Sequence, residues 1–343
     1  MSNTSPDVPL RVGLVGAGAH AHRNILPTLG MLDVELVAVA DMDSDRARET
    51  ARRHGAAHSF GSAEEMYASG EIDAALLVVS PTLHPTLAIQ AFEAGLDVWS
   101  EKPAAAASSQ VREMLEHRGD QVCVVGYKKA FMPSAVKARE LLPTGPRSAS
   151  AVYPVSLPLG EGEAPYPVSD WLTSGCHPLS LLVSVVGPVA RVTAYRPPHG
   201  GGVVVLEHRS GAVSTLHASL GAPKFQPCER YLFAADDGAV EIINTRKVIH
   251  RRPFWPDYNS DDNFAPVGQE GGSLVWEAQD TMATLQGKNV VTQGIYGGLH
   301  AFVEAARTRR APEVGTLEFA LEVTKVYEAA LRSNGNPVEV DAA

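Results

Sequence analysis

Residues 11–29 read RVGLVGAGAHAHRNILPTL, and this stretch decides the fold of the first part of the chain. A short apolar run leads into a glycine-rich turn, and a segment of helical character follows. Gly16 suits a tight turn, Gly18 lets the backbone approach a pyrophosphate, and the small Ala21 allows the strand and the helix to pack closely. The free N–H groups at the start of the helix would face the phosphates. The pattern predicts a dinucleotide-binding turn, with contacts from Gly16, Gly18, Ala19 and His20.

Short apolar runs alternate with helical segments up to about residue 131. Nearly continuous apolar runs are typical of strands buried on both faces of a parallel sheet, and strand–helix alternation is typical of a doubly wound α/β domain. We expect strands within 11–16, 34–41, 72–80, 96–100 and 121–127, and helices at 22–32, 44–54, 63–69, 83–94 and 108–117.

The character of the sequence changes after residue 148. Strand-like runs joined by turns predict an α+β domain with an open, mainly antiparallel sheet. These runs cover 148–158, 190–197, 201–209, 211–220, 230–236 and 238–244. One helix at 173–186 interrupts them, residues 251–272 read as a long irregular loop, and helices at 297–309 and 317–332 close the chain. We therefore expect two domains, a dinucleotide-binding one over 1–127 and a second one over 128–343, whose last helices can pack back on the first domain.

Composition places the chain among globular proteins. Its 343 residues suggest two domains, and 45% apolar with 20% charged residues excludes intrinsic disorder. The net charge of −10 does not favour binding to nucleic acid or to an anionic membrane. No apolar run reaches the ~18–20 residues that span a bilayer, and the polar first ten residues resemble neither a signal nor a transit peptide. Three distant cysteines imply no disulfide framework, so we expect a cytoplasmic protein.

Asp41 bears on the choice of cofactor. It ends the second predicted strand, 23 positions after Gly18, where a carboxylate accepts hydrogen bonds from ribose hydroxyls and repels a 2′-phosphate. Met42 follows it, and Arg46 and Arg48 belong to the next helix, so NAD is favoured over NADP. The alternative is that Asp41 only caps that helix.

A metal site is not expected. His20 and His22 are two positions apart at a helix start and do not converge on one ion, and no other cluster has ligand spacing.

Two further loops end parallel strands on the side where open α/β sheets bind ligands. The first is Ser80-Pro-Thr-Leu-His84 and the second is Glu101-Lys102-Pro103. A lysine at such a position can donate a hydrogen bond to a substrate oxygen and stabilise developing negative charge, although it can also be an ordinary surface residue. Further cofactor contacts are expected from Ser80, Pro81, Thr82, His84, Glu101 and Lys102.

The sequence resembles the Gfo/Idh/MocA oxidoreductases, the family of glucose–fructose oxidoreductase and the inositol dehydrogenases. The resemblance covers nearly the whole chain and rests on GAGAHAHRNILPTL, Asp41, SPTLH, AGLDVWSEKP, VGYKKAFMP, Gly175-Cys-His177 and HAFVEAARTRRAP. It implies a Rossmann domain followed by an open sheet that carries the substrate site and packs against a second subunit. It also implies that Lys102 is the catalytic lysine and that His177 is the histidine of an Asp-x-Gly-x-His motif.

The motif departs from the family at several positions. Thr173 stands in place of the carboxylate, Ser180 in place of a second common Asp, and Ala130-Phe131 in place of an Arg-Phe pair. A neutral histidine still suits proton removal from a secondary alcohol, because its ordinary pKa is ~6.5. His177 as a buried structural residue is the alternative. The substrate-facing candidates are Lys128, Tyr153, Asp170, Trp171, Thr173 and His177, with Tyr166, Arg251, Trp255 and Tyr258 around them.

The resemblance implies an NAD-dependent oxidoreductase acting on a secondary alcohol or ketone of a sugar, cyclitol or related polyhydroxylated compound. It also implies a homo-dimer or homo-tetramer formed through the C-terminal sheet. Two alternatives remain open: an NAD-retaining glycosidase that uses transient oxidation, and a non-catalytic regulator that senses dinucleotide or sugar.

Overall fold

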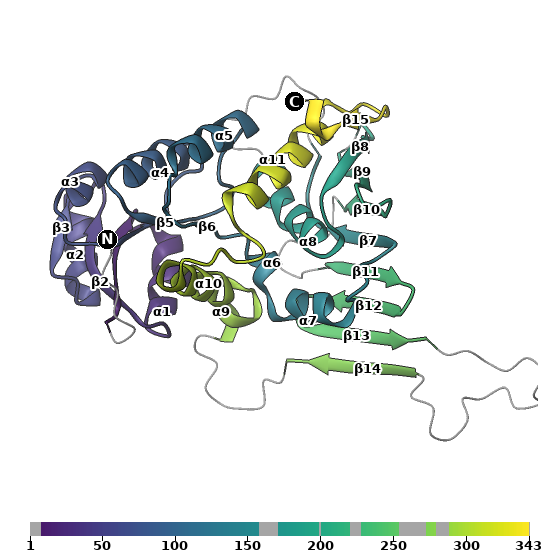
Figure 1. The fold of residues 1–343 in the computed structure, drawn as a ribbon, viewed down its shortest axis with the longest axis horizontal. Coiled ribbons are helices and arrows are strands. Elements are labelled where there is room, and N and C mark those ends of the chain that lie inside the picture. Colours follow the sequence, from purple (N-terminus) through teal and green to yellow (C-terminus); the bar gives the residue numbers. More distant parts are fainter. Residues whose placement is uncertain are drawn as a thin grey trace, which may run out of the picture.

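The computed structural model describes residues 8–157, 171–198, 200–219, 228–253, 272–278 and 288–342. This part of the chain forms two sheets that lie side by side. Two C-terminal helices, α10 (Ile295–Thr308) and α11 (Leu317–Arg332), lie between the sheets (Figure 1). No helix in these ranges is long and apolar enough to cross a bilayer.

The first sheet has six strands in the order β3-β2-β1-β4-β5-β6, and every pair is parallel. This is the Rossmann order, in which the connections reverse direction between β1 and β4 and leave a crevice at the carboxyl ends of the strands. β4 and β5 are buried at every position, as the continuous apolar runs predicted. The strands are β1 Leu10–Val15, β2 Val34–Ala40, β3 His58–Phe60, β4 Ala74–Leu77, β5 Asp97–Ser100 and β6 Cys123–Val125.

The helices of this half agree with the sequence except at the first one. The helix expected at 22–32 is a π-helical turn, Ala21–Ile25, that continues into α1 and ends three residues early. It ends there because Met31 and Leu32 bond back to Thr28 and Leu29 in a tighter turn. The others are α2 Ser44–His54, α3 Ala63–Ala68, α4 His84–Glu93 and α5 Ser108–His117, and α1 is Leu26–Leu29.

The second sheet has nine strands in the order β14-β13-β12-β11-β7-β10-β9-β8-β15. All its pairs are antiparallel except β7 with β10, so the predicted mainly antiparallel sheet is confirmed. The strands are β7 Ser148–Tyr153, β8 Val189–Tyr195, β9 Gly202–His208, β10 Val213–Ala218, β11 Arg230–Ala235, β12 Gly238–Ile243, β13 Lys247–Arg252, β14 Gly272–Glu277 and β15 Val338–Glu339.

The loop predicted over 251–272 is wrong at both ends. Arg251 and Arg252 complete β13, and Gly272 begins β14, because these residues continue the ladder along the edge of the sheet. Trp255 and Tyr258 lie outside the described residues, as do Tyr166 and Asp170.

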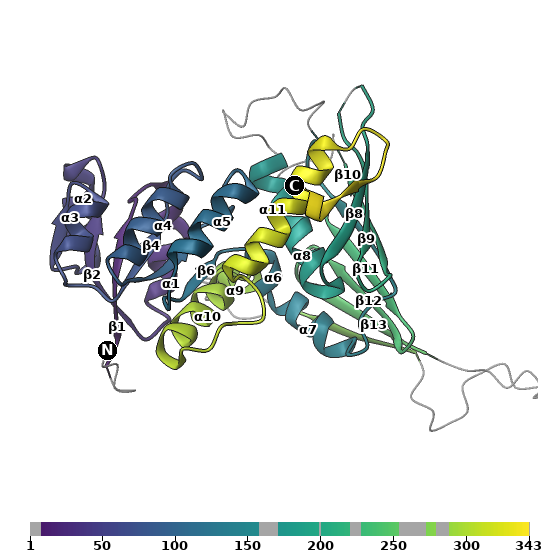
Figure 2. The same ribbon diagram turned by 45° about the horizontal axis from the view of Figure 1, so that its top comes forward.

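Helices pack on one face of the second sheet, where α7, α8 and α11 are seen in Figure 2. The helix expected at 173–186 begins two residues earlier, as a π-helical turn Trp171–Gly175 that continues into α8. The one expected at 297–309 spans Ile295–Thr308. The helices of this half are α6 Lys128–Phe131, α7 Pro133–Leu141, α8 Cys176–Val186, α9 Lys288–Thr292, α10 Ile295–Thr308 and α11 Leu317–Arg332, with a 3₁₀ turn at Val340–Ala342.

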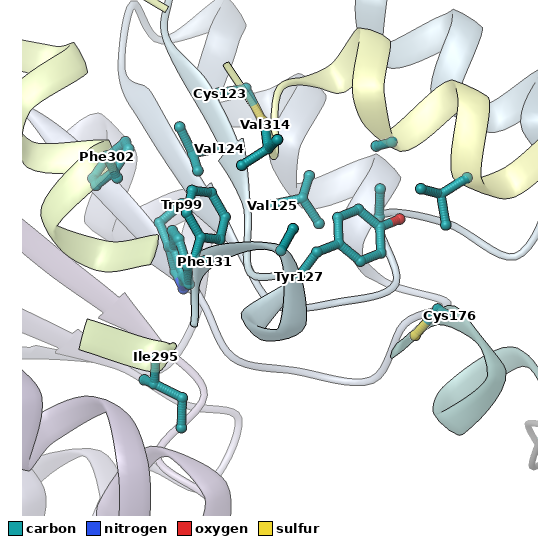
Figure 3. Close-up of a cluster of buried hydrophobic side chains, with 14 of the residues drawn as sticks. Trp99, Cys123, Val124, Val125, Tyr127, Phe131, Cys176, Ile295, Phe302 and Val314 are labelled. Carbon is teal, nitrogen blue, oxygen red and sulfur yellow. The ribbon is translucent and has the colours of Figure 1, made fainter. Parts of the chain in front are cut away.

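The two halves share a continuous hydrophobic core. Figure 3 shows Trp99 of the first sheet beside Phe302 of α10, with their ring centroids 6.4 Å apart. Polar contacts add to this packing: Arg309 donates to Asp97 at 2.6 Å, and the Ser108 N–H donates to Glu328 at 2.7 Å. Close-packed interiors resist deformation, so residues from both halves can form one site of fixed geometry.

Candidate active site

The glycine-rich turn leaves room for a dinucleotide. Gly16 has a φ of 94°, and a Cβ there would lie 2.4 Å from the carbonyl oxygen of Val78, so only glycine fits. A Cβ on Gly18 would meet no atom within 4 Å, and Gly18, Ala19 and His20 are all exposed. The turn therefore offers backbone N–H groups beside open space, which is what a pyrophosphate requires.

Asp41 is fixed at the end of β2 by both of its carboxylate oxygens. Oδ2 accepts from the Ala17 N–H at 2.8 Å, and Oδ1 accepts from the Asp43 N–H at 3.0 Å. Arg46 adds a fork, from Nε to Oδ2 at 3.1 Å and from NH2 to Oδ1 at 2.6 Å. Partial burial acts to raise the pKa of Asp41, but these hydrogen bonds outweigh it and lower the pKa.

The alternative reading of Asp41 as a helix cap is wrong. Asp41 does not cap α2, because Asp43 does: its side chain accepts from the Arg46 N–H. Arg46 lies in α2, as expected, and the helix turns its guanidinium back onto Asp41 in a contact that was not predicted.

The loop after β4 combines exposed and buried residues. Ser80 and Thr82 are exposed, and their hydroxyls lie 3.1 Å apart. His84, expected to contact the cofactor, is fully buried, and its Nδ1 donates to the Pro103 carbonyl at 2.8 Å. Burial lowers the pKa of His84. The His84 imidazole therefore connects this loop to the Glu101-Lys102-Pro103 turn. The Lys102–Pro103 peptide bond in that turn is cis.

Glu101 is buried, and contacts with the His20 imidazole and the Lys102 N–H orient its carboxylate. Its Oε1 lies 3.1 Å from His20 Nε2, and its Oε2 accepts from the Lys102 N–H at 3.2 Å. Nε2 is the donor in this contact, because a carboxylate only accepts, and His20 Nδ1 lies 3.1 Å from Asn24 Nδ2. Burial acts to raise the pKa of Glu101, but the hydrogen bond and charge of His20 and the charge of Lys102 outweigh it and lower the pKa.

Lys102 connects the two halves of the site. Its Nζ donates to the main-chain carbonyl of Thr173 at 3.0 Å, within the π-helical turn that precedes α8. Trp171, expected at the substrate, is fully buried behind this turn and stacks on Tyr327. A Cβ on Gly175 would lie 2.4 Å from the Trp171 ring, so the glycine lets the indole support the turn.

His177 is the second residue of α8, and it lines the cavity described below. Its side chain is 8% exposed, and its Nδ1 has no hydrogen-bond partner in the described structure. Burial lowers the pKa of His177 well below its ordinary value, and the charges of Lys102, Lys128, Lys129 and His20 lower it further. The imidazole is held neutral, which is the form that accepts a proton.

Two adjacent lysines follow β6 and have different surroundings. Lys129 is buried and pairs with Glu229 at 2.5 Å, with its Nζ 6.0 Å from the centre of the Tyr153 ring. The Tyr153 ring lies 6.4 Å from that of His177. Lys128 instead donates to the amide oxygen of Gln293 at 2.7 Å.

These elements surround a cavity of about 100 Å³ at the carboxyl ends of β5 and β6. It is lined by His20, Trp99, Glu101, Lys102, Gly126, Lys128, His177, Gly294 and Ile295. Five predicted site residues thus lie together around this cavity: His20, Glu101, Lys102, Lys128 and His177. Three larger hollows, of 710, 570 and 620 Å³, lie at the second sheet beside Tyr195, Arg147 and Trp276. The smaller cavity is the chemically relevant one, because among these four it is the one that combines an ammonium, a neutral imidazole and the cofactor turn.

Several contributors carry no motif that would reveal them. Gln293, Gly294 and Ile295 come from the junction of α9 and α10, far along the chain from the Glu-Lys-Pro turn. Gly294 has a φ of 85°, and a Cβ there would lie 2.1 Å from the Lys128 carbonyl oxygen. The one available signal was a glycine immediately before an amphipathic helix.

Comparison with known proteins identifies the class. Residues 10–128 match the sequence model of a family described as an oxidoreductase family with an NAD-binding Rossmann fold. The crystal structure of a dehydrogenase from Chromobacterium violaceum superposes with a TM-score of 0.79 at 22% identity, over 94% of both chains, and shares this fold. The fold and the glycine-rich turn define an NAD-binding Rossmann protein. The match over residues 10–128 is to the Gfo/Idh/MocA oxidoreductase family, and this part of the chain is similar to that family.

Two curated relatives are similar over part of their length. One stretch is 37% identical to an uncharacterized oxidoreductase of Rhizobium meliloti, covering 32% of this chain and 33% of that protein. Another is 34% identical to inositol 2-dehydrogenase of Corynebacterium glutamicum, covering 40% and 42%. The matches cover 33%, 40% and 65% of the lengths of the first three curated relatives. The chain thus spans less than two thirds of each of these proteins.

Proposed function

We propose that this chain is an NAD-dependent oxidoreductase that transfers hydride between nicotinamide and a secondary alcohol or ketone of a polyhydroxylated small molecule. The observation that carries the proposal is the cavity in which the Lys102 ammonium and the neutral His177 imidazole lie beside the cofactor turn. The matched family and the inositol 2-dehydrogenase relative support the reaction class.

Each side chain has a role that its surroundings allow. In the oxidative direction His177 accepts the hydroxyl proton, because burial keeps its imidazole neutral. Lys102 donates a hydrogen bond to the substrate oxygen and stabilises the negative charge that develops there. Gly16, Gly18, Ala19 and Asp41 would hold NAD⁺, with further contacts from Ser80, Pro81 and Thr82, and the cofactor would supply the hydride acceptor. Glu101, oriented by His20, fixes the turn that carries Lys102.

The second half of the chain supplies the substrate side. We assign residues 1–127 to the cofactor and 128–343 to the substrate and to assembly. Lys128, Tyr153 and Thr173 are proposed to contact the substrate directly, and Trp171 to support the turn from behind. Asp170, next to that turn in sequence, is proposed to contribute as well.

A homo-dimer or homo-tetramer is proposed to form through the open face of the second sheet. Tyr195, Val213 and Leu232 project from this face, opposite to the buried side chains of their strands, and are 55%, 42% and 40% exposed. A cytoplasmic location is also proposed, because all three cysteines are free thiols, as in a reducing compartment. Light scattering of the wild type and of Leu232→Glu tests the assembly; an unchanged mass in the variant would exclude this face.

The activity is tested by following NADH absorbance while the purified chain and NAD⁺ are mixed with inositols, sugars and sugar acids. We expect the wild type to turn over at least one of these substrates. Lys102→Ala should lose this turnover but still bind NADH, as measured by calorimetry. Cleavage of a glycoside without net reduction of NAD⁺ would establish the glycosidase alternative. Dinucleotide binding with no turnover of any kind would indicate a regulator.

A further inference from the structure

The two adjacent lysines after β6 differ in how their charges are compensated. Lys129 forms a buried ion pair with Glu229 at 2.5 Å, which also accepts from the Tyr231 hydroxyl at 3.3 Å. Lys128, one position earlier, lines the cavity and has only the neutral amide oxygen of Gln293 as a hydrogen-bond partner within the described ranges. No carboxylate of those ranges lies within ion-pair distance of its ammonium.

The remaining charges around the cavity do not compensate Lys128 either. The one carboxylate in the lining, Glu101, already accepts from His20 and from the Lys102 N–H. The Lys102 ammonium has a neutral main-chain carbonyl as its partner. The cavity is therefore lined by two ammonium groups whose partners are neutral, and by one carboxylate that is already engaged.

Burying an uncompensated cation is unfavourable unless a partner supplies the opposite charge. Burial, together with the charges of Lys129 and Lys102, lowers the pKa of Lys128 to about 8. His177 lines the same cavity, and its buried Nδ1 has no hydrogen-bond partner among the described residues. Within the described structure, Lys128 thus lacks an opposite charge and His177 lacks a hydrogen-bond partner, both on the same cavity.

We propose that the substrate carries a carboxylate next to the carbon that exchanges hydride, and that Lys128 binds this carboxylate. The inference deepens the proposed function and rests on it. It narrows the substrate from neutral sugars and cyclitols to 2-hydroxy acids and their 2-keto forms, including sugar acids. In the oxidative direction the carbinol carbon loses a hydride to NAD⁺, and its hydroxyl proton passes to His177, leaving a 2-keto acid, NADH and one proton.

The size of the cavity agrees with this class. A cavity of about 100 Å³ has room for a small polar group of a few non-hydrogen atoms. A carboxylate and the adjacent carbinol fill such a space, with the carboxylate against Lys128 and the reacting oxygen against Lys102. A single ammonium beside an amide matches one carboxylate charge better than a doubly charged phosphate.

The test compares substrates that share a carbon skeleton and differ in charge: gluconate against glucitol, and lactate against propane-1,2-diol, each with NAD⁺. We expect kcat/KM at least ~10-fold higher for the carboxylates. Lys128→Met should bring the ratio of carboxylate to neutral substrate toward one, a loss of ~10–100-fold, as for a hydrogen bond between charged groups. Lys128→Arg should retain most of the preference. Lys137→Met removes a lysine that pairs with Glu140 on the surface of α7 and should leave the ratio unchanged.

A binding measurement separates failure of the inference from failure of the proposed function. Oxalate is titrated calorimetrically into the NADH complexes of the wild type and of Lys128→Met, and NADH binding itself shows that the variant is folded. We expect the wild type to bind oxalate at least ~10-fold more tightly. The inference would be overturned if Lys128→Met turned over these substrates with an unchanged preference for carboxylates, or if the wild type preferred phosphorylated substrates. In either case the oxidoreductase function would stand. If no substrate turns over, the function fails, and equal oxalate affinity in the two proteins would overturn the anion site as well.

Discussion

The ammonium of Lys102 donates a hydrogen bond to the main-chain carbonyl of Thr173 across 3.0 Å, and this contact joins the end of β5 to the turn before α8. The family motif has a carboxylate where Thr173 stands, yet the contact needs no particular side chain at that position. Lys102 is therefore held over the cavity by the backbone of the second half, while its own N–H bonds to Glu101.

Lys102→Ala is expected to lower kcat by ~10²-fold or more, the scale seen when one preorganised donor to a developing oxyanion is lost. The affinity for NADH should change far less, because the glycine-rich turn and Asp41 do not depend on this ammonium. Steady-state kinetics measures kcat, and calorimetry measures the affinity for NADH. Near-normal turnover in the variant would remove Lys102 from the mechanism.

Arg46 makes cofactor selectivity depend on two residues. With Asp41 present, the guanidinium is occupied and a 2′-phosphate is repelled, so NADH should bind more tightly than NADPH. In Asp41→Ser the guanidinium is released, and the affinity for NADPH should rise by ~10-fold or more, as expected for a charge-assisted contact with phosphate. Calorimetry with both cofactors measures this. Asp41→Ser combined with Arg46→Met is the control, and an equal gain in that double variant would contradict the role of Arg46.

The long capped helices could be predicted from the sequence because their end signals are local. α2, at 44–54 as expected, begins after Asp43, whose side chain caps it, and ends at Gly55 in the left-handed conformation. α11, at 317–332 as expected, begins after Thr316, whose hydroxyl accepts from the Phe319 N–H. Short elements lack such signals: β3 has three residues, none of them buried, and is recognisable only through its pairing with β2.

The candidate site could be predicted only in part, for the same reason. Lys102, His177 and Lys128 lie in motifs that can be read locally, whereas their partners cannot. Glu229 is separated from Lys129 by 100 positions, and Gln293 from Lys128 by 165, so only the tertiary fold brings them together. The contact of Arg46 with Asp41 could not be predicted either, because it depends on how α2 leaves the strand.

The two glycines of the cofactor turn should respond differently to substitution. Gly16→Ala places a Cβ against the Val78 carbonyl at a positive φ and should cost at least about 1–2 kcal/mol in the free energy of unfolding. Gly18→Val introduces its side chain into open space, so stability should change by less than about 0.5 kcal/mol while NADH affinity falls. Urea denaturation and calorimetry separate the two effects. Unimpaired NADH binding by Gly18→Val would show that the dinucleotide does not cross this turn.

The buried pair of Lys129 and Glu229 should matter for stability. Lys129→Met leaves a buried carboxylate without its partner and should lower the free energy of unfolding by about 3–5 kcal/mol. Combining it with Glu229→Gln removes the unpaired charge and should recover part of this loss. Lys137→Met, at the exposed pair with Glu140, is the matched control and should cost less than about 1 kcal/mol. Equal costs at the two pairs, measured by urea denaturation, would contradict this assignment.

The pH dependence of alcohol oxidation tests His177. The acidic limb of kcat/KM reports the pKa of the base in the free enzyme, and burial together with Lys102, Lys128, Lys129 and His20 lowers that of His177. A lowered pKa keeps the imidazole neutral to lower pH, so the limb should lie below pH ~6.5. Thr173→Asp adds a negative charge one turn before His177, which favours the imidazolium and should move the limb to higher pH, whereas the uncharged Thr173→Asn should not. His177→Ala should abolish the limb and most of the activity. If that variant keeps both its activity and its pH profile, the histidine is structural and the proton must leave through Lys102, Tyr153 or water.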